Sequence, residues 1–132
     1  MKQPSPDSID LNSFAGLQQY CLDLPGTTEE YPFGPTPLVM KVSGKMYALI
    51  QPGDTPSISL KCDPFISELL RQQYEAVKPG YHLNKRLWIT VDVNETVPAE
   101  ELRDWIVSSY QLVVSKLTKA QRAALQQLGE QQ

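Results

Sequence analysis

The sequence of 132 residues has no long hydrophobic segment, because its uninterrupted apolar runs are only a few residues long, as in Leu112-Val113-Val114. A transmembrane helix needs about 20 consecutive apolar residues, so no membrane-spanning helix is expected. The first residues also lack the apolar stretch and the small-residue cleavage site of a secretory signal. We therefore expect a cytoplasmic protein with no membrane partner.

Side chains that bind metals or act as nucleophiles are scarce. The chain has two cysteines, Cys21 and Cys62, and one histidine, His82, and their spacing matches no metal-binding motif. Both cysteines lie on apolar stripes, where they serve as small hydrophobic side chains, with a redox role as the alternative. The sequence also contains no phosphate-binding glycine-rich loop and no nucleophile elbow. We expect a protein that is not an enzyme and that needs no metal and no cofactor.

A general excess of positive charge is absent as well, since 12 basic residues face 15 acidic ones and the net charge is -3. A protein whose whole surface attracts nucleic acid would be basic, so DNA binding would require a local patch. Positive charge is concentrated in residues 41–86, which hold seven basic residues and four acidic ones. Any nucleic-acid site is therefore expected in this middle third.

The length fits one domain over residues 1–132. Within it, residues 1–8 are polar and proline-rich and are expected to be loose, and residues 118–132 are expected to form a fraying C-terminal helix or tail. Apolar residues at helical spacing and alternating strand patterns predict the remaining elements. In chain order these are a helix over 11–21, strands over 38–42, 45–50 and 57–62, a helix over 64–77, a strand over 87–93 and a helix over 98–117.

Several local patterns set the ends of these elements. Asp10 or Asn12 can cap the first helix, and Asp63 caps the second, with a proline at its first position. Ser43-Gly44 between two apolar runs predicts a tight hairpin. Residues 27–37 must be extended or turning, and a short strand around residues 30–33 is one option. The apolar stripe predicted to bury the second helix consists of Ile66, Leu69, Leu70 and either Gln73 or Tyr74.

This order predicts a two-layer α+β fold, in which helices pack on one face of an antiparallel sheet in an α-β-β-β-α-β-β-α-like order. Such a sheet leaves its other face open to solvent or to a partner. The strand alternation predicts the members of that open face, which are Lys41, Ser59, Lys61, Arg86, Trp88 and Thr90.

Four sequence blocks, in this order, resemble the MmcQ/YjbR family: YCLDLPGT at 20–27, EYPFG at 30–34, LKCDP at 60–64 and PGYHLNKR at 79–86, followed by Trp88 and Thr90. The resemblance extends from about Tyr20 to Leu117. It implies an α+β fold with an antiparallel sheet, related in shape to secretion-chaperone folds, and a "double-wing" DNA-binding function. At Leu87 and Ile89 this sequence is apolar where the family pattern is polar.

The most informative segment for function is 81–88, which offers two cations, an imidazole, an amide and two aromatic rings. Cations neutralise phosphates and aromatic rings stack on bases. The alternative is structural, with His82 and Asn84 capping a loop and the aromatic rings packing. The segment Tyr31–Pro35 also allows two interpretations: it is a rigid recognition loop, or it is a conformationally restricted connection before the hairpin. The candidate DNA-binding residues are Lys41, Lys45, Lys61, His82, Asn84, Lys85, Arg86, Trp88 and Thr90.

Three functions remain open at this point. The first is weak, phosphate-directed binding of double-stranded DNA through the cationic residues. The second is a protein-interaction module, chaperone-like or self-associating, that uses the open sheet face to bind a protein partner or a second copy of itself. The third is a small-molecule pocket near Tyr31, His82 and Trp88. Steep salt dependence of binding would single out nucleic acid, because counterion release accompanies phosphate binding.

Overall fold

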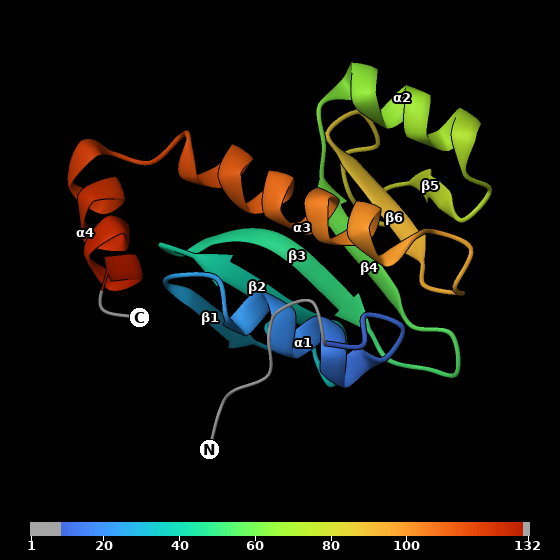
Figure 1. The fold of residues 1–132 in the computed structure, drawn as a ribbon, viewed down its shortest axis with the longest axis horizontal. Helices are drawn as coiled ribbons and strands as arrows, with labels where there is room; N and C mark the ends of the chain where they lie inside the picture. Colours follow the sequence, from blue (N-terminus) through green and yellow to red (C-terminus); the bar gives the residue numbers. More distant parts are fainter. Residues whose placement is uncertain (1–8, 131–132) are drawn as a thin grey trace.

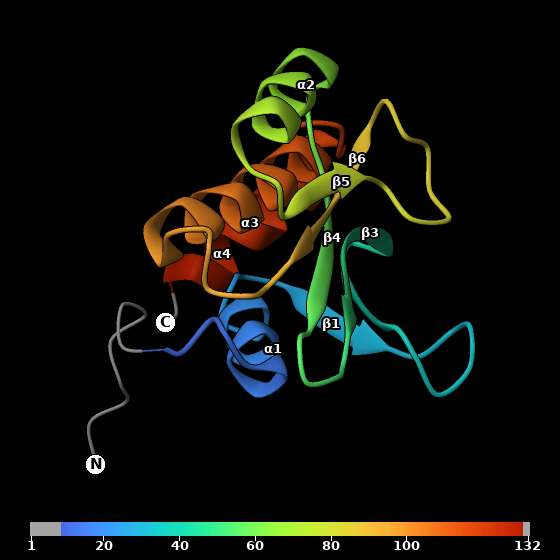
Figure 2. The ribbon, with the colours of Figure 1, turned by 90° about the vertical axis from the view of Figure 1, so that its right-hand side faces the viewer.

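Six antiparallel strands form one open sheet in a computed structural model that describes residues 9–130. The strand order is β1-β2-β3-β4-β6-β5, and the helices of this part of the chain lie on one side of the sheet (Figures 1 and 2). The strands are β1 (Thr27–Glu30), β2 (Leu38–Val42), β3 (Lys45–Gln51), β4 (Ser57–Lys61), β5 (Val77–Pro79) and β6 (Trp88–Asp92). The helices are α1 (Phe14–Leu22), α2 (Pro64–Gln73), α3 (Ala99–Val114) and α4 (Lys119–Glu130). The predicted two-layer α+β class is confirmed.

Local sequence signals placed several boundaries correctly. The β2–β3 hairpin turns at Ser43 and Gly44, whose φ angles of 49° and 79° are both positive, as a type I′ turn requires. The Asp63 carboxylate accepts hydrogen bonds from the Phe65 and Ile66 amides and caps α2, as predicted. The cap predicted for α1 was wrong. Ser13 caps that helix by accepting a hydrogen bond from the Gly16 amide at 3.0 Å.

Three elements differ from the expectation. The strand predicted from residue 87 begins at Trp88, and residues 77–79 form the edge strand β5 instead of a helix end. Pro79, which has no backbone N–H, is tolerated there because one side of an edge strand forms no hydrogen bonds to another strand. The segment after residue 117 starts a separate helix, α4. Its start is a capping box, in which Thr118 Oγ1 accepts from the Gln121 amide and Gln121 Oε1 accepts from the Thr118 amide. The predictions for residues 1–8, 131 and 132 lie outside the described residues.

Helix α2 buries much less than its sequence stripe predicted. Only Ser67 and Leu70 are buried, whereas Ile66 and Leu69 are 45% and 46% exposed. The physical reason is position: α2 packs over the short strand β5 and the adjacent β6 at one side of the sheet, where only Leu70 of the predicted stripe joins the buried residues of the main core (Figure 1). The prediction of a buried stripe on α2 was therefore wrong for Ile66 and Leu69.

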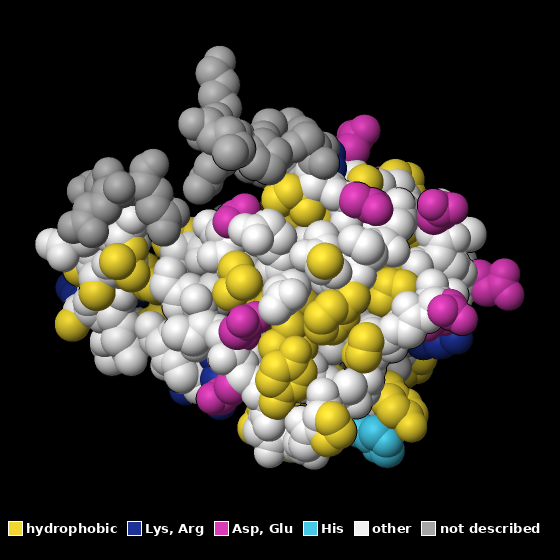
Figure 3. All heavy atoms as spheres, turned by 90° about the horizontal axis from the view of Figure 1, so that it is seen from below, with side chains coloured by type: hydrophobic (Ala, Val, Ile, Leu, Met, Phe, Trp, Pro, Cys, Tyr) yellow, Lys and Arg dark blue, Asp and Glu magenta, His cyan; other side chains and the backbone are white. Residues whose placement is uncertain are grey.

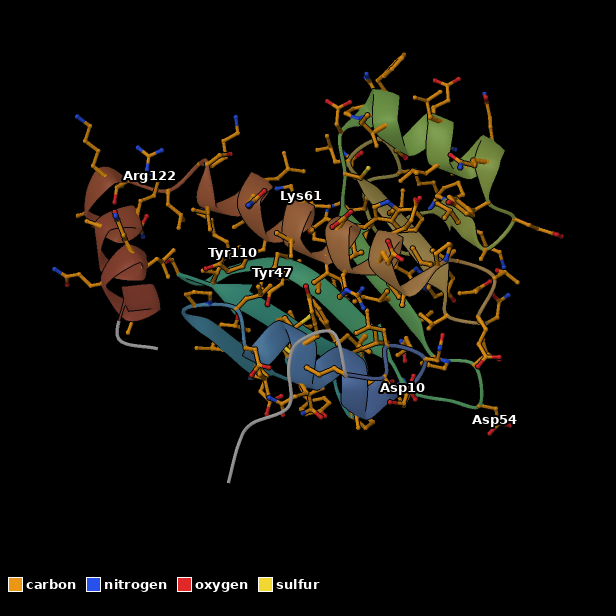
Figure 4. All side chains as sticks on the ribbon, viewed as in Figure 1. Asp10, Tyr47, Asp54, Lys61, Tyr110 and Arg122 are labelled. Atoms are coloured by element: carbon orange, nitrogen blue, oxygen red, sulfur yellow. The ribbon has the colours of Figure 1, made fainter. Side chains whose placement is uncertain are left out.

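The main core lies between the sheet and helices α1 and α3. Tyr47 and Tyr110 meet there edge to face, with ring centroids 5.3 Å apart (Figure 4). The Tyr47 hydroxyl donates to the Cys21 carbonyl at 3.1 Å. Burial raises the pKa of the Cys21 thiol to about 12 and that of the Cys62 thiol to about 11. Both thiols are therefore protonated at neutral pH and are weak nucleophiles.

A bulge in β3 interrupts the sheet beside this core. Met40 pairs with Ala48 and Lys41 pairs with Met46, so Tyr47 is an extra residue on β3. On the other side of β3, the buried Ser109 hydroxyl of α3 bridges β3 and β4. It donates to the Tyr47 carbonyl at 2.6 Å and accepts from the Lys61 amide at 2.8 Å. One helix side chain thus links β3 and β4 one residue beyond their last backbone pair, Ala48 and Leu60.

The substitution Ser109→Ala should destabilise the fold. It leaves the buried Tyr47 carbonyl and the partly buried Lys61 amide without partners, at a cost of up to about 1–3 kcal/mol for each group. The adjacent Ser108 is exposed, so Ser108→Ala is the matched control and should change stability by less than about 0.5 kcal/mol. Urea denaturation measures both variants. Equal midpoints for the two would show that the bridge contributes nothing.

Candidate nucleic-acid interface

The sheet face opposite the helices, hereafter the outer face, carries its own small apolar cluster. Val39, Leu49 and Trp88 are buried together, with Met46 and Leu83 packed against them. The strand register also pairs Ser59 with Thr90 and Lys61 with Trp88. The alternation in β4 and β6 therefore predicted the correct face for these four residues.

The outer face is less open than predicted. Trp88, Ser59 and Thr90 are only 7%, 8% and 9% exposed. The reason is the segment between β5 and β6, hereafter loop 80–87, which folds back over the face and packs Leu83 on the apolar cluster. Arg86 lies in this loop and not on a strand, which corrects its predicted place on the sheet.

Loop 80–87 is held in shape by its own polar groups. Asn84 Oδ1 accepts from the Arg86 amide at 2.9 Å, and the Trp88 amide donates to the Asn84 carbonyl at 3.0 Å. Lys85 Nζ donates to the Gly80 carbonyl at 3.0 Å. A Cβ atom at Gly80 would lie 2.7 Å from the Cβ of Trp88, so this close approach needs glycine. Asn84 thus serves the loop itself, as the structural alternative proposed.

The predicted cations converge on one end of the sheet. Neighbouring strands run in opposite directions, so β2 and β4 end where β3 and β6 begin, at the same end of the sheet. The Cys62 amide donates to the Leu87 carbonyl at 2.8 Å, which ties the end of loop 80–87 to the residue after β4. The predicted cations at this end are Lys41, Lys45, Lys61, Lys85 and Arg86.

Two of these five cations are poorly placed for a phosphate. Lys41 forms an ion pair with Glu30 across β1 and β2. Lys45 pairs in register with the core residue Val42, so it lies on the helix side of the hairpin and not on the outer face. For Lys61, Lys85 and Arg86, by contrast, the structure of residues 9–130 shows no carboxylate partner. The Lys61 ammonium lies 6.0 Å from the centre of the Trp88 ring. We call these three residues the basic end.

A second loop faces loop 80–87 across the outer face. The segment between β1 and β2, hereafter loop 31–37, projects from the sheet on the side opposite the helices, as loop 80–87 does (Figure 2). A cavity of about 250 Å³ lies between the two loops. Phe33 and Pro37 line one side, and Tyr81, His82 and Leu83 line the other. Figure 3 views the molecule from below and shows hydrophobic side chains gathered on this surface, some of them beside the histidine.

The floor of this cavity combines the apolar Leu49 with polar side chains. It includes Ser57, Ser59 and Thr90, with Gln51 beside them. The Ser59 and Thr90 hydroxyls are 2.8 Å apart, and Thr90 Oγ1 accepts from the Tyr81 amide at 2.9 Å. Thr90 therefore connects the sheet to loop 80–87. Of the predicted pocket residues, only His82 lines this cavity, because Trp88 lies beneath Leu83 and Phe33 takes the place expected for Tyr31.

A second hollow lies on the helix side, between α2 and α3. Its volume is about 340 Å³, and Ile66, Trp105 and Leu112 contribute apolar walls. Phe65 and Leu69 are exposed on α2 beside it, by 69% and 46%. Sequence analysis missed this surface because the stripe on α2 was expected to be buried. The described part of the chain holds no group of three or more His, Cys, Asp or Glu that could bind a metal, and no helix in it could span a membrane.

An open antiparallel sheet, covered by helices on one face and carrying two projecting loops on the other, defines the structural class of this protein. The YjbR family model matches residues 22–112, and the chain belongs to this family. Protein YbdF of Escherichia coli O157:H7 is 42% identical over 103 residues, covering 77% of this chain and 84% of YbdF. Protein YjbR of Escherichia coli K12 is 34% identical over 113 residues, covering 85% and 96% of the two chains.

Solved structures agree with this assignment. The crystal structure of Deinococcus radiodurans protein DR2400 superposes with a TM-score of 0.83 at 40% identity, covering 93% of this chain and 91% of that one. A crystal structure of a Pseudomonas syringae protein superposes with a TM-score of 0.66 at 30% identity, covering 74% and 96%. The fold and the family are thus established independently of the site.

The burial of Trp88 leads to a stability prediction. Trp88→Ala should cost about 3–5 kcal/mol of folding free energy, because it empties the centre of the outer-face cluster. Tyr31→Ala, at a residue that is 50% exposed in the facing loop, is the control and should cost less than about 0.5 kcal/mol. Thermal or urea unfolding measures both. A loss below about 1 kcal/mol for Trp88→Ala would contradict the packing described for loop 80–87.

Proposed function

We propose that this protein is a non-enzymatic, cytoplasmic DNA-binding protein that holds phosphates weakly and reads little base sequence in a duplex. The observation that carries the proposal is the basic end. Strand register and loop 80–87 bring Lys61, Lys85 and Arg86 together without carboxylate partners among the described residues, in a chain whose net charge is -3. Such a local cluster is the electrostatic footprint that an acidic chain needs for nucleic-acid binding.

The contribution of each candidate residue follows from its place. Lys61, Lys85 and Arg86 would contact phosphates directly. Lys41 would have to leave Glu30 first, and Lys45 would contribute only from the other side of the hairpin. Trp88, Thr90 and Asn84 are positioning residues, since the first two are buried and Asn84 shapes the loop.

Self-association is the second candidate function, and the exposed apolar side chains on α2 favour it. Phe65, Ile66 and Leu69 lie beside the hollow between α2 and α3, and exposed apolar clusters of this kind mark interaction surfaces. A second copy is the occupant that the charges suit, because antiparallel pairing of two α2 helices would place Glu68 of one copy near Arg71 of the other. This location differs from the sheet face considered from sequence.

The double variant Lys85→Ala/Arg86→Ala tests DNA binding. It should weaken binding to unrelated duplexes equally, because phosphate contacts carry no sequence information. The slope of log affinity against log salt should fall by about 1.8, at about 0.9 for each phosphate that the variant no longer neutralises. Fluorescence anisotropy with a labelled duplex, measured across a salt series, gives both quantities.

The matched control is Lys116→Ala/Lys119→Ala, which removes the same charge from exposed residues at the junction of α3 and α4. It should leave the salt slope unchanged. Equal slopes for the parent and the Lys85/Arg86 variant would remove the basic end from the site. Undetectable duplex binding by the parent at low salt, together with a concentration-dependent dimer in sedimentation velocity, would instead favour self-association.

A further inference from the structure

The cavity between loop 31–37 and loop 80–87 has a composition that phosphate binding does not explain. Phosphates are bound by cations and amide groups, whereas this cavity presents aromatic walls. Phe33 on one loop and Tyr81 on the other are 63% and 65% exposed, so both rings present large surfaces that the fold does not use. His82 lies against Tyr81, with ring centroids 4.0 Å apart, and widens the aromatic wall.

The cavity floor offers hydrogen bonds that the protein does not fill. The Ser59 and Thr90 hydroxyls share one hydrogen bond, and Thr90 Oγ1 also accepts from the Tyr81 amide. Two hydroxyl groups carry two hydrogens, and their mutual bond uses one of them. Within residues 9–130 no acceptor is found for the second hydrogen. Because both side chains are more than nine-tenths buried, this hydrogen and the remaining lone pairs are available only to an occupant of the cavity.

The size and shape of the cavity restrict the occupant. Its volume of about 250 Å³ is below the range of about 300–1,000 Å³ that is typical of sites for drug-sized ligands. Flat aromatic walls with a floor that both donates and accepts hydrogen bonds suit one planar heteroaromatic ring with polar edges. A nucleobase has this chemistry, and base–aromatic stacking is available to every base.

The cavity also lies close to the basic end. Thr90 on its floor is two residues from Trp88 along β6, a distance of about 7 Å along a strand. Lys61 is the cross-strand partner of Trp88, and its ammonium lies over the Trp88 ring. A base in the cavity and a phosphate at Lys61 would therefore be within reach of one nucleotide unit.

We propose that the cavity between loops 31–37 and 80–87 binds one unpaired nucleobase. Phe33, Tyr81 and His82 stack against the ring, and Ser59 and Thr90 hydrogen-bond its edge. This inference rests on the proposed function, since the cations of the basic end hold the adjacent phosphate. A base that is stacked and paired inside a duplex cannot enter the cavity, so single strands are the preferred ligand.

The test compares two labelled single strands of eight units, one of thymidylate and one with the same phosphates but abasic sugars. The parent protein should bind the thymidylate strand about 5- to 150-fold more tightly, the range expected for one stacked base. Phe33→Ala and Tyr81→Ala should reduce or abolish this preference without changing the salt slope. Ser59→Ala should reduce it while keeping both aromatic walls.

Phe65→Ala is the matched control, because Phe65 is a similarly exposed phenylalanine, at 69%, on α2 of the helix side. It should keep the full preference. Free thymidine monophosphate, added as a competitor, identifies the source of the base. If it displaces the thymidylate strand, the site is open to free nucleotides. If it does not, while the thymidylate strand is still preferred, the site binds a base that is part of a strand. Equal affinity of the parent for both strands would overturn the base site and leave phosphate binding intact. Binding of neither strand and no duplex would overturn both proposals.

Discussion

The hydroxyl group of Ser109 is the contact on which the arrangement of this sheet depends. The backbone pairing of β3 with β4 ends at Ala48 and Leu60, and one residue further along Ser109 of α3 links the Tyr47 carbonyl to the Lys61 amide. The hydrogen bond to the Lys61 amide fixes the end of β4, where Lys61 pairs with Trp88. Through this side chain the helix layer helps to position residues of the opposite face, and losing the bridge would leave each of its two partner groups unsatisfied, at about 1–3 kcal/mol each.

The outer face combines two kinds of chemistry that the fold keeps side by side. Loop 80–87 covers the apolar cluster with Leu83 and at the same time brings Lys85 and Arg86 to the basic end. Thr90 joins this loop to the sheet by accepting from the Tyr81 amide. The cations that we propose for phosphates and the aromatic rings that we propose for a base thus lie on the same side of the sheet. In this account, affinity comes from the cations and discrimination between paired and unpaired bases comes from the cavity.

Local patterns in the sequence predicted the parts of this structure that depend on neighbouring residues. The Ser43-Gly44 turn, the Asp63 cap and the alternation in β4 are examples, because turn geometry and strand period act over a few residues. The bulge at Tyr47 and the exposure of Ile66 could not be predicted in this way. Both depend on which elements meet in space. The candidate cations were chosen from charge and strand alternation, and the alternation already placed Lys61 on the outer face. That Lys41 is held by Glu30 needed the pairing of β1 with β2. That Phe33 and Ser59 line one cavity could not be predicted, because the cavity forms only where loop 31–37 and loop 80–87 lie near each other.

The most direct test of the central claim is a map of the residues that respond to nucleic acid. Amide chemical shifts can be followed by NMR while a thymidylate strand of eight nucleotides is added to the folded protein. The account predicts the largest changes at Lys61, Tyr81 and Thr90 and in loop 31–37, with α2 unaffected. Changes centred on Phe65 and Leu69 of α2, or none on the outer face, would contradict it.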